Sequence, residues 1–218
     1  NNCLGQAIEA LTGNIRVGTR PIQMFEWTRT FHPDSGADNG VCTEVHRLWS
    51  IACGSSEPDR WNGPPRQTTV WRFKGIIEEI GTALGLPLVM STDATDHALS
   101  DCLHPGRQAS IQLNGVTVGI LGEVHPRVTK AFKLKRVRPV YFELERDALL
   151  TPRPPARFRE RSVHQPILRS LAFSLPPRVT AGEVAATLTA AGPPWLDAVD
   201  MVDLFEHEHD GIAMRAVT

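Results

Sequence analysis

Two short histidine-containing segments carry the residue types best suited to chemistry. His104 precedes Pro-Gly-Arg, and Glu123 and His125 belong to a Gly-Glu-Val-His-Pro segment at 122–126. Imidazole and carboxylate groups that converge could hold a zinc ion, and the metal would activate water for hydrolysis. Proline and glycine in both segments are also typical of turns and helix starts, where each histidine bonds nearby backbone. We favour the turn interpretation and keep a His/Glu metal hydrolase as an alternative.

Other histidines and aromatic residues have similar structural interpretations. His207-Glu208-His209-Asp210 could present two imidazoles on one strand face, but we favour a solvated hairpin turn. Indole side chains usually pack in a core or an interface, which is the expectation for most of Trp27, Trp49, Trp61, Trp71 and Trp195. Phe205 differs because it ends a predicted strand beside Asp203, where an exposed aromatic ring could stack on an RNA base.

Charge is unevenly distributed along the chain. A net charge of -1 and a pI near 6.8 argue against attraction of polyanions by the whole molecule. Between residues 130 and 169, however, basic residues outnumber acidic ones. The basic residues are Lys130, Lys133, Lys135, Arg136, Arg138, Arg146, Arg153, Arg157, Arg159, Arg161 and Arg169, against Glu143, Glu145, Asp147 and Glu160. This excess could meet phosphate groups, or it could be the basic residues of a solvated linker.

Several function classes lack their motifs in this sequence. There is no Walker loop, Rossmann fingerprint, His-Glu-x-x-His pair or Gly-x-Ser-x-Gly segment. The four cysteines, at positions 3, 42, 53 and 102, form no Cys-x-x-Cys pair, so we expect reduced thiols and a cytoplasmic protein. No apolar run approaches the ~20 residues of a membrane span, and no membrane partner is expected.

Hydrophobic spacing and turn signals predict the elements that must position these residues. Apolar residues at helical spacing predict helices over about residues 4–15, 73–84 and 126–132. Alternating or β-favouring runs predict strands at residues 22–31, 43–53, 109–113, 116–120 and 140–144. Asn114-Gly115 joins two of these strands and is favoured in two-residue hairpin turns, because both residues tolerate positive φ. Residues 1–150 are therefore expected to form one α+β domain.

A proline- and arginine-rich segment then divides the chain. Residues 151–165 begin Thr-Pro-Arg-Pro-Pro, a composition typical of a stiff, extended linker. The following part, residues 166–218, carries a predicted strand at 171–175, a helix at 181–191 and strands at 198–205 and 212–217. This β-α-β-β order is the first two thirds of a ferredoxin-like module, without its closing helix and strand.

Taken in order, five segments resemble the C-terminal part of the β subunit of bacterial phenylalanyl-tRNA synthetase, across essentially all 218 residues. They are residues 24–31 (Met-Phe-Glu-Trp-Thr-Arg-Thr-Phe), 73–78 (Phe-Lys-Gly-Ile-Ile-Glu), 104–107 (His-Pro-Gly-Arg), 119–126 (Gly-Ile-Leu-Gly-Glu-Val-His-Pro) and 141–144 (Tyr-Phe-Glu-Leu). Residues 162–173 also look like the entry to the family's ferredoxin-fold anticodon-binding domain.

The resemblance implies a phenylalanine–tRNA ligase of (αβ)2 composition, in which the α subunit uses ATP and magnesium to activate phenylalanine and charge tRNA(Phe). Residues 1–150 would then be a catalytic-like, class II synthetase-like antiparallel sheet with helices. That domain would pack against α, with no catalytic residue, metal site or cofactor of its own. His32 stands where the catalytic relatives carry a phosphate-clamping arginine, and an imidazole cannot supply a bidentate clamp.

The same resemblance implies the tRNA contacts. Val202-Asp203-Leu204-Phe205 is similar to the family's Phe-Asp-Leu-Tyr segment, which places the anticodon-contacting acid and aromatic ring on Asp203 and Phe205. Gly211, where relatives often have serine, and Arg215 complete the expected tRNA-binding set. The family's editing and magnesium sites belong to other modules of the β subunit. A stand-alone ferredoxin-like interaction module remains a further alternative.

Overall fold

The chain folds into two compact units, Asn1–Pro155 and Ala156–Thr218, in a computed structural model. The structure describes residues 2–19, 21–33, 42–55, 61, 67–92, 97–150, 158, 160, 163–209 and 212–218. The boundary between the units falls inside the expected linker, residues 151–165, most of which lies outside the described residues.

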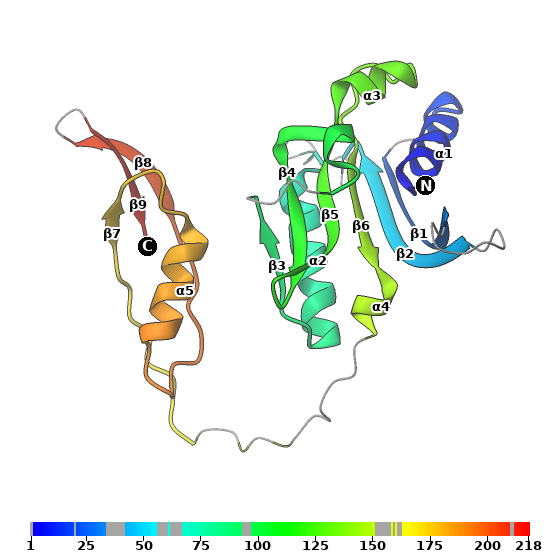
Figure 1. Cartoon of the computed structure of the whole chain (residues 1–218). Coiled ribbons are helices and arrows are strands. Elements are labelled where there is room, and N and C mark those ends of the chain that lie inside the picture. Colours follow the sequence, from blue (N-terminus) through cyan, green and yellow to red (C-terminus); the bar gives the residue numbers. More distant parts are fainter. Residues whose placement is uncertain are drawn as a thin grey trace. The chain divides into compact units, whose positions relative to one another are not determined.

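A six-stranded sheet forms the centre of the first unit, with the strand order β1-β2-β6-β5-β4-β3 (Figure 1). Every neighbouring pair of strands is antiparallel. The strands are β1 (Ile22–Pro33), β2 (Cys42–Cys53), β3 (Leu88–Ser91), β4 (Leu103–Leu113), β5 (Val116–Val124) and β6 (Val140–Glu145). The predicted α+β class with an antiparallel sheet is confirmed.

Helices cover the two faces of this sheet. Helix α1 (Leu4–Arg16) buries an apolar stripe that includes Ile8 and Leu11 in one core layer, together with Ile51 and Tyr141 of the sheet. Helix α2 (Val70–Leu84) belongs to the core layer of the other face, where the ring of Phe73 meets the ring of Phe142 edge-on at 5.4 Å. Both helices lie where their 3.6-residue spacing predicts.

The predicted hairpin at Asn114-Gly115 is confirmed, with φ values of 52° and 81° in the two turn residues. Its strands, β4 and β5, are longer than predicted, because β4 continues through an irregular stretch between Leu103 and Gln108 that holds the His-Pro-Gly-Arg segment. Helix α3 (Pro126–Ala131) follows β5. Strand β3, the 3-10 turn η1 (Ser100–Cys102) and the short helix α4 (Arg146–Leu149) were not predicted, since each is too short to establish a period.

The second unit has a three-stranded antiparallel sheet in the order β7-β9-β8. Its elements are β7 (Phe173–Leu175), α5 (Ala181–Ala191), β8 (Leu204–His209) and β9 (Ile212–Val217) (Figure 1). Helix α5 starts with a capping box, in which the Thr180 side chain accepts from the Glu183 backbone N–H and the Glu183 carboxylate accepts from the Thr180 backbone N–H.

Two expectations for this unit were wrong. The strand expected at residues 198–205 begins only at Leu204, because Asp197, Asp200 and Asp203 interrupt the preceding stretch and aspartate is unfavourable in strands. A hairpin turn was also expected at residues 207–210. Residues 207–209 instead continue strand β8 and pair with β9.

The expectation that most tryptophans pack in a core or an interface is met in the core by one of them. Only Trp49 is buried, with its ring stacked 6.5 Å from that of Tyr141. Trp27, Trp61, Trp71 and Trp195 are all exposed in this chain. An exposed indole is typical of an interface, so these residues mark surfaces of interest.

Candidate functional site

The sheet of the second unit has two unlike faces. Strand alternation and the observed register place Phe173, Leu175 and Val217 on one face, and an apolar groove joins the first two to Val184 of α5. Phe205 pairs with Ala216 in the register, so its side chain belongs to the opposite face, which helix α5 does not cover. We call this second face the open face.

Phe205 presents an aromatic ring on the open face. Its side chain is 63% exposed, and its ring lies nearly parallel to that of His207, with the centroids 6.2 Å apart and an interplanar angle of 8°. Nε2 of His207 lies 3.3 Å from the hydroxyl oxygen of Ser174 on β7, a contact that orients the imidazole. An exposed ring with a parallel neighbour is an arrangement on which a base of a single RNA strand can stack.

Asp203 is fixed immediately before Phe205's strand. Its Oδ1 accepts a hydrogen bond of 2.8 Å from the Leu204 backbone N–H. Its own backbone N–H and C=O pair with the backbone of Thr218 at 3.2 and 3.0 Å. These bonds hold the carboxylate at the start of β8 and leave Oδ2 without a hydrogen bond among the described residues.

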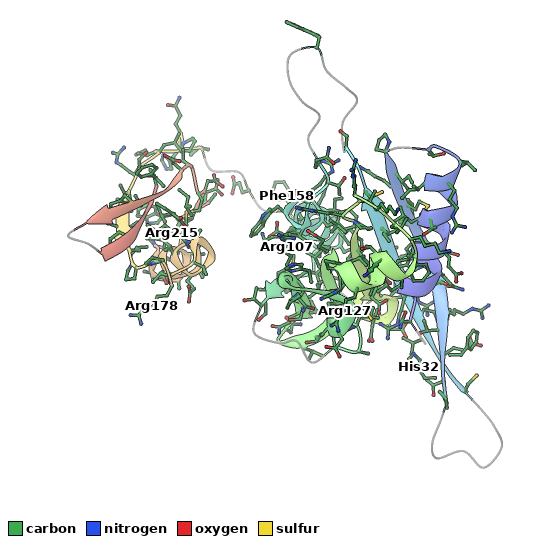
Figure 2. The ribbon with its side chains drawn as sticks, turned by 90° about the horizontal axis from the view of Figure 1, so that it is seen from above. His32, Arg107, Arg127, Phe158, Arg178 and Arg215 are labelled. Carbon is green, nitrogen blue, oxygen red and sulfur yellow. The ribbon has the colours of Figure 1, made fainter. Side chains whose placement is uncertain are left out.

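Arg215 lies on the other face from Phe205. Its Nη2 donates to Oε1 of Glu206 at 2.9 Å, and its Nη1 donates to the Val179 backbone carbonyl at 3.5 Å (Figure 2). Asp203 and Phe205 are therefore near each other, whereas Arg215 is separated from them by the sheet. The fourth expected contact, Gly211, lies outside the described residues.

A buried polar cluster lies in the first unit, on the α1 face of the sheet. Oε1 of Glu143 accepts from Nη1 of Arg47 at 3.0 Å, and its Oε2 accepts from the Tyr141 hydroxyl at 2.6 Å. Nη2 of Arg47 also donates to Glu145 at 3.3 Å. Burial and the Glu143 charge raise the pKa of Tyr141 above its usual range, while burial lowers the pKa of nearby His97.

This cluster was not found from the sequence. Its members come from separate strands, and only the register of β2 against β6, with Trp49 opposite Glu143, brings Arg47 into reach. The available signal was a single glutamate inside the apolar run Val-Tyr-Phe-Glu-Leu, since a buried glutamate needs a cationic partner.

His32 lies close to this cluster, near the end of β1 (Figure 2). Its Nε2 is 3.1 Å from the hydroxyl oxygen of Thr30, which in turn accepts from Nε of Arg47 at 3.4 Å. Thr30 thus links His32 to the guanidinium that is paired with Glu143 and Glu145.

The two histidine-containing segments have structural roles. Nδ1 of His104 accepts from the Gly106 backbone N–H at 3.2 Å, and Nδ1 of His125 accepts from the Arg127 backbone N–H at 3.0 Å. Both oxygens of Glu123 accept from Nη1 of Arg107 at 3.0 Å. In the part of the chain that the structure describes, no three His, Cys, Asp or Glu residues are placed to hold a metal ion.

Strand β1 exposes a row of large side chains. Phe25, Trp27 and Phe31 alternate along one face of the strand and are 74%, 52% and 42% exposed. Trp27 borders an open cavity of about 430 Å³, whose lining also includes Arg29 and Arg146. We call Phe25, Trp27 and Phe31 the β1 aromatic row.

Comparison with known proteins relates most of this chain to one family. A family model described as the phenylalanyl tRNA synthetase beta chain CLM domain matches residues 1–146. The phenylalanine–tRNA ligase beta subunit of Dechloromonas aromatica is 34% identical over 172 residues, covering 78% of this chain and 20% of the relative. That of Thiobacillus denitrificans is 29% identical over 218 residues, covering 98% of this chain and 26% of the relative.

A weaker structural similarity relates the chain to the pyrrolysyl-tRNA synthetase of Desulfitobacterium hafniense. The TM-score is 0.46 at 11% identity, covering 68% of this chain and 48% of the other.

The chain belongs to the family of phenylalanine–tRNA ligase beta subunits, which are components of an aminoacyl-tRNA synthetase. It spans between a fifth and about a quarter of the length of the two relatives described above. No helix among the described residues is long and apolar enough to cross a membrane.

Proposed function

We propose that this chain serves subunit assembly and recognition of the tRNA(Phe) anticodon within a cytoplasmic phenylalanine–tRNA ligase. A separate α subunit of an (αβ)2 assembly would activate phenylalanine with ATP and magnesium and transfer it to the tRNA. The observation that carries this proposal is the exposed ring of Phe205 on the open face, parallel to His207.

The topology of the second unit supports an RNA-binding role. The order β7-β9-β8, with β9 antiparallel to both neighbours and α5 joining the outer strands, is that of the first β-α-β-β part of a ferredoxin-like module. Sheets of this kind bind single-stranded RNA with aromatic side chains on the face that lacks helices. Phe205 meets that description, and Asp203 lies beside it just before β8. The position of Arg215 supports a role in holding β8 to β9 through Glu206.

A non-catalytic role for the first unit is supported by its buried polar cluster. Arg47, which shares the Thr30 hydroxyl as a partner with His32, is neutralised by Glu143 and Glu145. An ATP phosphate would have to displace these carboxylates and would then leave Glu143 buried without its cation, which is strongly unfavourable. The residues present therefore do not fit ATP, and we assign ATP and magnesium to the α subunit.

The β1 aromatic row supports an assembly role. Large exposed aromatic residues beside arginine are enriched at the centres of protein interfaces. Strand β1 is also the edge of the six-stranded sheet, so this row is free of a further strand on that side among the described residues. We propose that the row packs against the α subunit.

Anticodon recognition is tested by comparing tRNA(Phe) with a tRNA(Phe) carrying a substituted anticodon, in the assembled enzyme. Wild type should prefer the natural anticodon. Phe205→Ala should weaken binding of tRNA(Phe) by about 5- to 150-fold, the equivalent of one base stack. Phe205→Tyr keeps the ring and should retain the affinity. Equal affinity of the wild type for the two tRNAs would contradict the proposal and favour the interaction-module alternative.

Assembly is tested by replacing Trp27 with a charged residue. Trp27→Glu should abolish or greatly weaken co-purification with α, because a carboxylate would be desolvated in the interface. Trp71→Glu is the matched control, since Trp71 is also exposed, at 74% against 52% for Trp27, but lies on α2 and is not part of the row. Equal loss of assembly in both variants, or in neither, would contradict the role given to the β1 aromatic row.

A further inference from the structure

The segment from Arg127 to Arg138 is a compact cationic surface, which we call the basic loop. It consists of helix α3 and the chain that follows it, and residues 126–139 contain no aspartate or glutamate. Its six basic side chains all belong to exposed residues: Arg127, Lys130, Lys133, Lys135, Arg136 and Arg138. Figure 2 shows Arg127 on the first unit, at the start of this surface.

The cations of the basic loop lack acidic partners. None of the six forms an ion pair with any residue that the structure describes. Elsewhere in the same unit Arg29, Arg47, Arg107 and Arg146 are each paired with a carboxylate at 3.0 or 3.1 Å. The basic loop thus differs from the ordinary charged surface of this unit, in which positive and negative side chains neutralise each other.

The backbone of the basic loop gives a second, independent observation. Three helices of the first unit end in the same hydrogen-bond pattern. A residue with left-handed backbone donates its N–H to the carbonyl of the residue three positions earlier. The next residue donates its N–H to the carbonyl of the residue five positions earlier. The left-handed residue is Gly18 after α1, Gly85 after α2 and Lys133 after α3. The bonds after α3 are Lys133 N to Lys130 O at 3.0 Å and Leu134 N to Thr129 O at 2.9 Å.

A lysine at this position is unfavourable for the fold. The left-handed region suits glycine because a Cβ atom crowds the following carbonyl oxygen. Lys133 has a φ of 58°, and Arg136 has a φ of 59°, so two of the six cations occupy such a conformation. The two equivalent helix ends carry glycine, Gly18 and Gly85, which suits this conformation better. The lysine at 133 therefore indicates a functional role for its positive charge rather than a contribution to folding stability.

The core holds the basic loop in place. Leu134 is buried in the layer under α1, and Phe132 and Val137 pack against the same layer. These apolar anchors alternate with the cations, so Lys133, Lys135 and Arg136 are directed away from the core. A fixed array of cations loses less conformational entropy on binding than a flexible tail.

We propose that the basic loop binds the sugar–phosphate backbone of RNA without reading its sequence. The six cations form no ion pair among the described residues, so they match a polyanion. Their apolar neighbours point into the core, so the surface offers no apolar group for insertion into a lipid bilayer. The choice of RNA over another polyanion rests on the proposed function. This contact is on the first unit and is separate from the open face of the second, so the two roles can fail independently.

The test uses the 218-residue chain and a short RNA duplex of arbitrary sequence, with affinity measured by fluorescence anisotropy between about 50 and 200 mM salt. Lys133→Gly should weaken binding about fivefold at physiological salt and make the slope of log affinity against log salt shallower by about 1. The melting temperature of this variant should be unchanged or higher, because glycine relieves the left-handed backbone. Lys133→Arg keeps the charge and should bind like the wild type.

Arg72→Gln is the matched control, since Arg72 is exposed on α2, forms no ion pair among the described residues and carries the same single charge. It should leave both affinity and slope unchanged. Equal weakening by Arg72→Gln and Lys133→Gly would overturn the proposal, because the effect would then follow net charge alone. Tighter binding of the chain to anionic vesicles than to RNA would also overturn it. Equal affinity of the wild-type assembly for tRNA(Phe) with the natural and the substituted anticodon would contradict anticodon recognition. Weaker duplex binding by Lys133→Gly in the same preparation would still support the basic loop.

Discussion

Arg47 and Glu143 form an ion pair of 3.0 Å between β2 and β6, with side chains only 11% and 2% exposed. The pair lies on the face of the sheet that α1 covers. Removing only one of the two charges is costly, because the remaining buried charge then has neither water nor a partner. The interaction therefore links β2 to β6 in a way that a single substitution should disrupt.

Replacing Arg47 should be strongly destabilising. Arg47→Met leaves the Glu143 carboxylate buried, and we expect the free energy of unfolding to fall by about 3–5 kcal/mol in urea titrations followed by circular dichroism. Lys74→Met is the control, because Lys74 pairs with Glu78 on the surface of α2 and the loss should stay below about 1 kcal/mol. Similar losses for both variants would show that the Arg47 pair is not desolvated.

Gly119 is required by the close approach of β5 to β6. A Cβ atom at this position would lie 2.1 Å from the Glu143 backbone oxygen, a contact that side-chain rotation cannot relieve. Gly119→Ala should therefore cost at least about 3 kcal/mol or prevent folding, as judged by urea titration.

Gly75, in the middle of α2, is the control for this substitution, since a Cβ there meets no heavy atom within 4 Å. Gly75→Ala should raise the free energy of unfolding by about 1 kcal/mol, through helix propensity. A stable Gly119→Ala protein would mean that β5 and β6 lie farther apart than described.

Stability should fall at alkaline pH through Cys3. Burial, with a smaller contribution from the Glu143 charge, raises the pKa of the Cys3 thiol from about 9 to about 12. Between these values the folded state keeps a proton that the unfolded state has lost, so the free energy of unfolding decreases as pH rises, by up to about 1.4 kcal/mol per pH unit. Cys3→Ala should show a correspondingly shallower decrease from pH 9 to 11. An identical pH dependence in the two proteins would contradict a buried thiol.

Local signals in the sequence predicted those elements in which a residue type has one strong conformational preference. Asn114-Gly115 required a tight hairpin, and Gly85 marked the end of α2. Lys133 gave no such signal, because lysine rarely adopts a left-handed backbone. The sequence therefore did not predict that α3 ends in the same hydrogen-bond pattern as α1 and α2. Similarly, β8 was placed too early, since the pairing with β9 rather than intrinsic preference sets its start at Leu204.

For the candidate site, strand periodicity could indicate which residues share a face of one strand, but not which residues of other strands lie beside them. Strand periodicity alone favours a core position for Phe205, whereas the register places its ring on the face that α5 does not cover, where it is exposed. The separation of Arg215 from Phe205 depends on the register of β8 against β9, which places Arg215 opposite Glu206 and Phe205 opposite Ala216. The Arg47–Glu143 pair joins residues 96 positions apart and could not be inferred from either segment alone.

The division of labour between this chain and an α subunit is tested most directly by two assays on one variant of the assembled ligase. With Phe205→Ala, kcat/KM for tRNA(Phe) in aminoacylation should fall by about 5- to 150-fold, while phenylalanine-dependent ATP–pyrophosphate exchange stays at the wild-type rate. Phe205→Tyr should restore aminoacylation. A parallel fall in exchange, or unchanged aminoacylation in Phe205→Ala, would contradict the account.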